Sequence, residues 1–310
     1  MIKSLNIGGY ISKNNLFIAP LAGFTDFAFR EVCLSLGAGL VYTEMVSCKA
    51  LEHDNEKTKG LLIGANENTV AQIFGNEPDT MRRACEREEL SPYKIVDINM
   101  GCPAPKIYNN KEGSYLINDF ALAGKIISEC SKSGKIITVK TRLGITNDNP
   151  KILDFAKLCE DNGAKLITIH ARSKEAVYSG ECNYSLIQQV KTKVNVPLIV
   201  NGGIFSKEDA LTAYKESGAD GIMLARGVLE NPTLICDILG KKAPSVKSIL
   251  YKQLELLNSV YNNEKLVAIR MRKAIAYYLK RVRGSREAKF KIFESESVSE
   301  IKNILSSVEF

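Results

Sequence analysis

The fold is decided most clearly by residues 197–227, PLIVNGGIFSKEDALTAYKESGADGIMLARG. Two apolar runs, 197–201 and 221–225, flank a mostly polar segment. Runs this short and this apolar are typical of strands that are buried on both faces. Between them, Ser206 is followed three residues later by Asp209, which is a signal for the start of a helix. The stretch therefore predicts a strand, a helix and a second strand parallel to the first.

The same kind of apolar run recurs along the first 240 residues. Eight such runs occur, at residues 16–20, 40–43, 70–74, 95–99, 136–140, 166–170, 197–201 and 221–225. Helical patterns lie between most of them, as at residues 152–162. The alternation predicts an α/β fold, a (β/α)8 TIM barrel, and residues 7–18 are expected to form a short hairpin under it. An open doubly wound sheet is the alternative, but no Gly-x-Gly-x-x-Gly follows the first run.

Residues 241–310 differ from the rest of the chain in pattern and in charge. They show no further strand, and helical patterns cover 250–261, 266–282 and 298–308. They contain 15 Lys and Arg against 7 Asp and Glu, whereas residues 1–240 contain 27 and 28. A solvated helical face is the ordinary explanation of a charge run, but an excess this one-sided favours a polyanion partner. We predict a catalytic barrel over 1–240 and a basic, all-helical RNA-binding domain over 241–310.

The numbers and spacing of cysteine, histidine and apolar residues exclude several classes of protein. The eight cysteines form no Cys-x-x-Cys pair, and only two histidines are present, so we expect no disulfide framework and no metal site. The N-terminal residues lack the apolar core of a signal peptide. No run approaches the roughly 18 apolar residues that span a bilayer. We therefore predict a cytoplasmic protein that is not in the membrane.

Glycine-rich turns follow the seventh and eighth predicted strands. The two turns are Asn201-Gly202-Gly203 and Ala225-Arg226-Gly227. The carboxyl ends of barrel strands meet on one face, and the loops after strands 7 and 8 commonly bind phosphate there. Glycine allows close approach of backbone N–H groups, and Arg226 adds positive charge. Two such loops on adjacent strands predict a phosphate site, for a substrate or for flavin mononucleotide (FMN).

Three further side chains are expected at the same face. Lys140 ends the fifth strand, where it could form a Schiff base or offset negative charge on a reduced flavin. His170 ends the sixth strand, beside it. Cys102 lies in the long connection after the fourth strand, between Gly101 and Pro103. A thiol with a pKa near ~8.5 is mostly protonated at neutral pH, so Cys102 could act as an acid, or as a nucleophile if its pKa were lowered.

An ordered set of motifs extends nearly from end to end of the chain. They are Ala19–Asp26, Glu44–Ser47, Ala71–Gly75, Asp97–Pro103, Val139–Gly144, Ile169–Arg172, Asn201–Ile204, Gly221–Gly227, Met271–Ala274 and Gly284–Glu287. With these motifs the chain resembles the tRNA-dihydrouridine synthases, and among them the bacterial B-type subfamily. It departs from that subfamily's common Gly-Asp at Gly202-Gly203, which keeps the backbone N–H and loses a carboxylate.

The resemblance implies an oxidoreductase that converts uridines in tRNA to 5,6-dihydrouridine. It implies bound FMN, NADPH or NADH as reductant, hydride transfer from FMN N5 to uracil C6, and protonation of C5 by Cys102. The implied FMN contacts are Pro20, Leu21, Ala22, Gln72, Lys140, His170, Asn201, Gly202, Gly203, Ala225 and Arg226. The RNA contacts that we predict are Asn99, Arg142, Arg172, Arg272, Lys273 and Arg286. A paired base would have to leave the stack to reach such a site.

Four alternatives remain at this level. A small-molecule flavin barrel, such as a dihydroorotate dehydrogenase, would share the fold but would not need the basic tail. A Schiff-base aldolase would use Lys140. A non-catalytic RNA-binding protein would not need polar groups at eight strand ends. Ribosomal RNA is the alternative substrate to tRNA.

Overall fold

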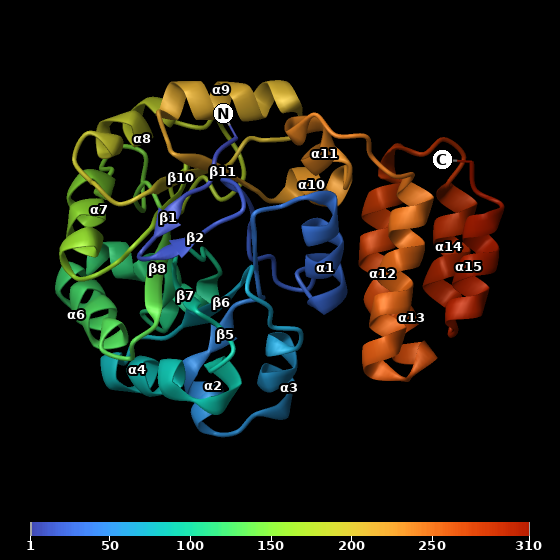
Figure 1. Ribbon diagram of the computed structural model, residues 1–310, viewed down its shortest axis with the longest axis horizontal. Coiled ribbons are helices and arrows are strands. Elements are labelled where there is room, and N and C mark those ends of the chain that lie inside the picture. The colour runs from blue at the N-terminus through green and yellow to red at the C-terminus, as the bar shows by residue number, and fades with distance from the viewer. Residues whose placement is uncertain (1, 310) are drawn as a thin grey trace.

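Eight parallel strands close into a barrel in the computed structural model, which describes residues 2–309 (Figure 1). The barrel strands are β3 (Leu16–Ile18), β4 (Leu40–Tyr42), β6 (Thr69–Phe74), β7 (Ile95–Met100), β8 (Ile136–Arg142), β9 (Ile167–His170), β10 (Leu198–Asn201) and β11 (Gly221–Leu224). β11 pairs with β3, and β4 pairs with β6, so the sheet closes on itself. A two-residue strand, β5 (Val46–Ser47), pairs in parallel with the carboxyl end of β6. The predicted TIM barrel is confirmed.

Helices surround the barrel, and shorter ones lie in its loops. The outer helices are α1 (Phe27–Leu36), α4 (Pro78–Glu86), α6 (Phe120–Ser131), α7 (Ile152–Asp161), α8 (Tyr184–Lys191), α9 (Lys207–Ser217), α10 (Arg226–Glu230) and α11 (Leu234–Leu239). The loop helices are α2 (Cys48–Glu52), α3 (Glu56–Lys59) and α5 (Pro105–Asn109). Ser206 caps α9 as predicted, and the Asp209 carboxylate accepts from the Ser206 N–H in return.

The apolar core has two parts, because successive strand residues point to opposite sides of the sheet. One part lies between the strands and the outer helices. The other fills the lower barrel interior with Phe17, Tyr42, Val70 and Leu166. Ile7, from a hairpin formed by β1 (Asn6–Ile7) and β2 (Tyr10–Ile11), is fully buried against this second part. The hairpin therefore closes the barrel bottom, and it ends well before the predicted residue 18.

The C-terminal segment forms a bundle of four helices, not the three that we predicted. They are α12 (Val246–Tyr261), α13 (Glu264–Tyr278), α14 (Arg286–Glu294) and α15 (Val298–Ser306). The helix predicted at 266–282 is also too long, because α13 ends at Tyr278 and a 3-10 turn follows it. The helix missing from our prediction, α14, buries only Ile292, so its sequence shows little apolar periodicity.

The helical bundle lies beside the barrel, at the right of Figure 1. It contacts the barrel through α12 against α1 and α13 against α10. The rings of Phe24 and Tyr277 meet edge to face across this junction, with their centroids 5.3 Å apart. Within residues 2–309, no helix has both the length and the apolar character needed to cross a membrane.

Candidate active site

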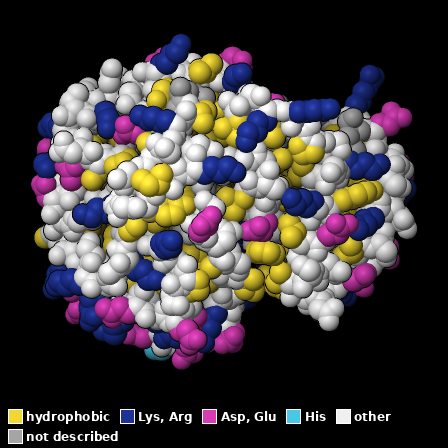
Figure 2. All heavy atoms as spheres, in the orientation of Figure 1, with side chains coloured by type: hydrophobic (Ala, Val, Ile, Leu, Met, Phe, Trp, Pro, Cys, Tyr) yellow, Lys and Arg dark blue, Asp and Glu magenta, His cyan; other side chains and the backbone are white. Residues whose placement is uncertain are grey.

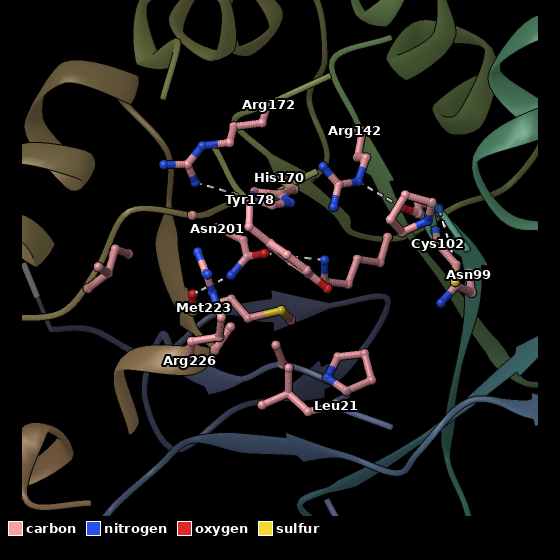
Figure 3. A pocket seen from close by; sticks show the side chains of 18 of the residues that line it. Leu21, Asn99, Cys102, Arg142, His170, Arg172, Tyr178, Asn201, Met223 and Arg226 are labelled. Atoms are coloured by element: carbon pink, nitrogen blue, oxygen red, sulfur yellow. Dashed lines mark hydrogen bonds between the residues drawn. The ribbon is translucent and has the colours of Figure 1, made fainter. Parts of the chain in front are cut away.

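A pocket opens at the carboxyl ends of the barrel strands (Figure 3). Every barrel residue that we predicted for the site lines it: Pro20, Leu21, Ala22, Gln72, Asn99, Cys102, Lys140, Arg142, His170, Arg172, Asn201, Gly202, Gly203, Ala225 and Arg226. These side chains come from strands far apart in sequence, so barrel closure is what brings them together.

Positive charge dominates the walls of the pocket. Burial, together with the nearby charges of Arg142, Lys140, Arg172 and Arg226, holds the pKa of His170 well below its usual value. His170 is therefore neutral at neutral pH. Burial lowers the pKa of Lys140 to about 8, so its ammonium is still mostly protonated at neutral pH, and it donates to Asn201 Oδ1 at 3.3 Å. A pocket with this charge favours an anionic ligand.

The turn at Gly202-Gly203 needs glycine at both positions. Both residues have left-handed backbone, with φ of 111° and 72°. A Cβ on Gly202 would lie 2.6 Å from His170 Cδ2, and one on Gly203 would lie 2.7 Å from the Tyr184 hydroxyl oxygen. That hydroxyl donates to the Gly202 carbonyl at 2.8 Å and fixes the turn. The two glycines thus let the turn pack against His170 and Tyr184 while it lines the pocket at the position predicted for a phosphate.

Arg142 and Arg172 are tied to backbone carbonyls. Arg142 donates through Nε to the Gly101 carbonyl (2.8 Å) and through Nη1 to those of Ser173 and Val177 (both 2.9 Å). Arg172 donates through Nε and Nη2 to the Gly180 carbonyl. Both side chains hold the loops around the pocket, and their contact with RNA remains a prediction.

Cys102 lies half-buried at the edge of the pocket. Its backbone N–H donates to Asn99 Oδ1 at 2.9 Å, which pins the residue to the end of β7. Burial raises the pKa of the Cys102 thiol, and the nearby Arg142 and Lys140 reduce the rise. The thiol is therefore protonated at neutral pH. This state suits a proton donor better than a nucleophile, since attack requires the thiolate.

Several side chains that line or support the pocket were not predicted from the sequence, among them Tyr178, Phe205, Cys182 and Tyr184. The Arg226 guanidinium carbon lies 4.5 Å from the ring centroid of Tyr178 and 5.6 Å from that of Phe205. Cys182 and Tyr184 pack under the Gly202-Gly203 turn. Cys182 is half-buried like Cys102, whereas the other six cysteines are buried. Tyr178 and Cys182 lie in the loop at 173–183, which no motif or periodicity marks, whereas Tyr184 begins α8 and Phe205 follows the turn after β10.

The three predicted RNA contacts of the helical bundle lie in different surroundings. Lys273 is exposed, and its Nζ would be 3.5 Å from a Cβ on Gly23, at the barrel rim. Arg272 is half-buried and donates to the Ser295 carbonyl at 3.1 Å. Arg286 is exposed, with its guanidinium 6.0 Å from the ring centroid of Phe290. On the face shown in Figure 2, Lys and Arg side chains lie over both the barrel and the bundle.

No three His, Cys, Asp or Glu side chains within residues 2–309 lie close enough to hold a metal ion.

Comparison with known proteins supplies a family for this site. The family model of the dihydrouridine synthases matches residues 17–309. The chain belongs to the dihydrouridine synthase family. tRNA-dihydrouridine synthase B of Pseudomonas aeruginosa is 34% identical over 296 residues, which cover 91% of this chain and 89% of the relative. The synthase B of Pasteurella multocida is 36% identical over 288 residues, covering 89% and 86%. The resemblance to the B-type subfamily is therefore confirmed.

A solved structure outside the family shares the fold. An old yellow enzyme homologue from Zymomonas mobilis matches with a TM-score of 0.56 at 12% identity, over 79% of this chain and 95% of its own. At this identity the likeness supports the barrel architecture alone.

Proposed function

We propose that this protein is a flavin-dependent tRNA-dihydrouridine synthase that reduces uridines in tRNA with electrons from NADPH or NADH. The observation that carries the proposal is the placement of a protonated thiol, Cys102, on the edge of the same cationic pocket that the two glycine turns enter. Family membership and the synthase B relatives support the substrate. We also propose that residues 1–240 form the catalytic barrel and that residues 241–310 form a helical domain that binds RNA.

The pocket residues fit FMN. Gly202 and Gly203 bring their backbone to the wall of the pocket, where its N–H groups would meet a phosphate, and Arg226 provides a cation in the same pocket. Lys140 lines the pocket, where its ammonium would offset negative charge on a reduced ring. Bound FMN would supply the hydride to C6 of the uracil. The chain's own residues would hold the cofactor and keep His170 neutral beside it.

Cys102 would supply the proton that C5 of the uracil needs after hydride addition. A thiol that rests protonated has this proton available without prior transfer. Asn99, adjacent to Cys102 in the pocket, would contact the uracil. Lys273 at the barrel rim and Arg286 further along the bundle would contact phosphates of the surrounding RNA.

The test is to incubate the purified full chain with unmodified tRNA transcripts and NADPH or NADH, and to map dihydrouridine by mass spectrometry. We expect a yellow protein and dihydrouridine at defined tRNA positions. Ribosomal RNA assayed in parallel separates the two RNA substrates. A colourless protein that borohydride and a carbonyl compound trap at Lys140 would contradict the proposal and favour an aldolase.

A further inference from the structure

A carboxylate lies beneath the pocket and does not line it. Asp97, on β7, is fully buried inside the barrel. Its Oδ2 accepts from Gln72 Nε2 at 2.7 Å and its Oδ1 accepts from Thr138 Oγ1 at 2.6 Å. The sheet register places these partners, because Gln72 on β6 and Thr138 on β8 are both paired with Asp97. A buried carboxylate is costly unless it is hydrogen-bonded, so its retention here needs an explanation.

The hydrogen bonds continue from Asp97 to Cys102. Gln72 Oε1 accepts from Asn99 Nδ2 at 2.9 Å. Asn99 Oδ1 then accepts from the backbone N–H of Gly101 at 3.1 Å and of Cys102 at 2.9 Å. Gln72 and Asn99 are themselves almost fully buried, with 1% and 8% of their surface exposed. The side chains thus form one continuous line from the barrel interior to the backbone of the thiol residue.

The donor-to-acceptor direction of these hydrogen bonds is set by Asp97, at the buried end of the line. An ionised carboxylate only accepts hydrogen bonds, so Gln72 has to present its NH2 group to Asp97. The Gln72 oxygen must then face Asn99, and Asn99 must turn its NH2 toward Gln72 and its oxygen toward Cys102. The side-chain amides of Gln72 and Asn99 can each take two orientations. The charge of Asp97 selects one orientation for each amide. Burial raises the pKa of Asp97 to about 6, which still leaves it ionised at neutral pH.

We propose that Asp97 is a positioning residue for Cys102 and acts through the side-chain amides of Gln72 and Asn99. The carboxylate fixes the polarity of both amides, and this polarity holds the Cys102 N–H and therefore the thiol at the pocket edge. The consequence for uridine reduction rests on the proposed function, whereas the placement of the thiol does not.

The decisive variant is Asp97→Asn, which keeps the volume and removes the charge. The Thr138 hydroxyl can donate or accept, so the new amide can present either its oxygen or its NH2 group to Gln72, and nothing at residue 97 selects the orientation of Gln72 and Asn99 any longer. We expect iodoacetamide to alkylate Cys102 in the FMN-loaded full chain roughly fivefold faster or more, because the loop is released. The midpoint of the alkylation pH profile should fall, since burial is what raises the pKa of this thiol.

Two further variants separate polarity from general damage to the core. In Asp97→Asn/Gln72→Glu the acceptor lies on residue 72, so Asn99 regains its original direction and the Cys102 profile should return to within about twofold of wild type. Thr138→Val disturbs the same carboxylate on the side away from Gln72, and should leave the profile within about twofold. If Asp97→Asn does not fold, Gln72→Met breaks the line directly and should release Cys102 in the same way.

The proposal would be overturned if Cys102 in Asp97→Asn alkylates with the wild-type profile. If Asp97→Asn does not fold, the same result in Gln72→Met would overturn it. So would an equal effect of Thr138→Val, or a double variant that alkylates like Asp97→Asn. Alkylation is followed by mass spectrometry at the Cys102 peptide, with Cys182 as the internal reference. If the wild-type protein makes no dihydrouridine while the variants alkylate as stated, the proposed function fails and the positioning role of Asp97 stands. If the wild-type protein makes dihydrouridine and the Cys102 alkylation profile does not change in Asp97→Asn, the proposed function stands and the positioning role fails.

Discussion

The barrel mouth and the helical bundle both present basic side chains, but they hold them differently. At the mouth, Lys140, Arg142 and Arg172 are half-buried or buried and bonded to neighbouring groups. On the bundle, Lys273 and Arg286 are exposed, and only Arg272 of the three predicted RNA contacts is half-buried and bonded to a carbonyl. Charges fixed in place suit one small anion with a defined shape, whereas exposed charges suit a polyanion whose phosphates need no fixed geometry. The difference favours a cofactor site in the first region and an RNA surface in the second.

The largest effect expected on the cofactor side comes from Gly202→Ala. The added Cβ would lie 2.6 Å from His170 Cδ2, at a residue with φ of 111°, so the turn must shift. We expect FMN affinity to fall roughly a hundredfold, measured by flavin fluorescence titration. Gly134→Ala is the matched control, since Gly134 has φ of 77° and no atom within 4 Å of its Cβ position. Equal FMN affinity in the two variants would show that the turn does not contact the cofactor.

The corresponding change on the bundle is Lys273→Glu/Arg286→Glu. We expect tRNA affinity to fall about tenfold at moderate salt, with FMN affinity unchanged, and the dependence of log affinity on log salt to become less steep by about two. Lys207→Glu/Lys215→Glu on α9 changes the net charge equally, at two exposed lysines on the barrel. If that control weakens tRNA binding as much, net charge and not the bundle surface explains the affinity.

The two regions also differ in how far the sequence predicts them. The barrel strands were predicted to within a few residues, and the strand-end side chains such as Gln72 and Asn201 could be assigned to one face because barrel topology leaves them no other place. The bundle was predicted less well, since α14 buries only Ile292. Tyr178 and the carbonyl contacts of Arg142 could not be predicted, because they depend on how a long irregular loop folds over the pocket.

A smaller effect concerns pH. The pKa of Lys140 is about 8, lowered by burial, so its charge is present below that value and is lost above it. We expect the affinity for anionic reduced FMN to fall several-fold as the pH rises from 7 to 9. In Lys140→Met the affinity should be lower at pH 7 and this step should be absent. A step of the same size in Lys140→Met would assign the titration to another group.

The smallest effect is expected at Tyr178. Its ring lies 4.5 Å from the Arg226 guanidinium and supports that side chain in the pocket. Tyr178→Leu should weaken FMN binding about two- to fivefold, which matches the strength of an exposed cation–π contact. Tyr178→Phe keeps the ring and should bind FMN like wild type. Loss in the Phe variant would point to the hydroxyl instead of the ring.

The proposed function depends on Cys102 as the donor of the proton to C5 of the uracil. The direct measurement is a single turnover: the FMN-loaded protein is reduced, excess reductant is removed, and tRNA is added while flavin absorbance and dihydrouridine are followed. We expect Cys102→Ala to retain FMN and tRNA affinity but to reoxidise at least about a hundredfold more slowly than wild type, with matching loss of dihydrouridine. Cys236→Ala, at a buried cysteine away from the pocket, should behave as wild type. Reoxidation of Cys102→Ala at the wild-type rate, with dihydrouridine formed, would show that Cys102 is not the proton donor.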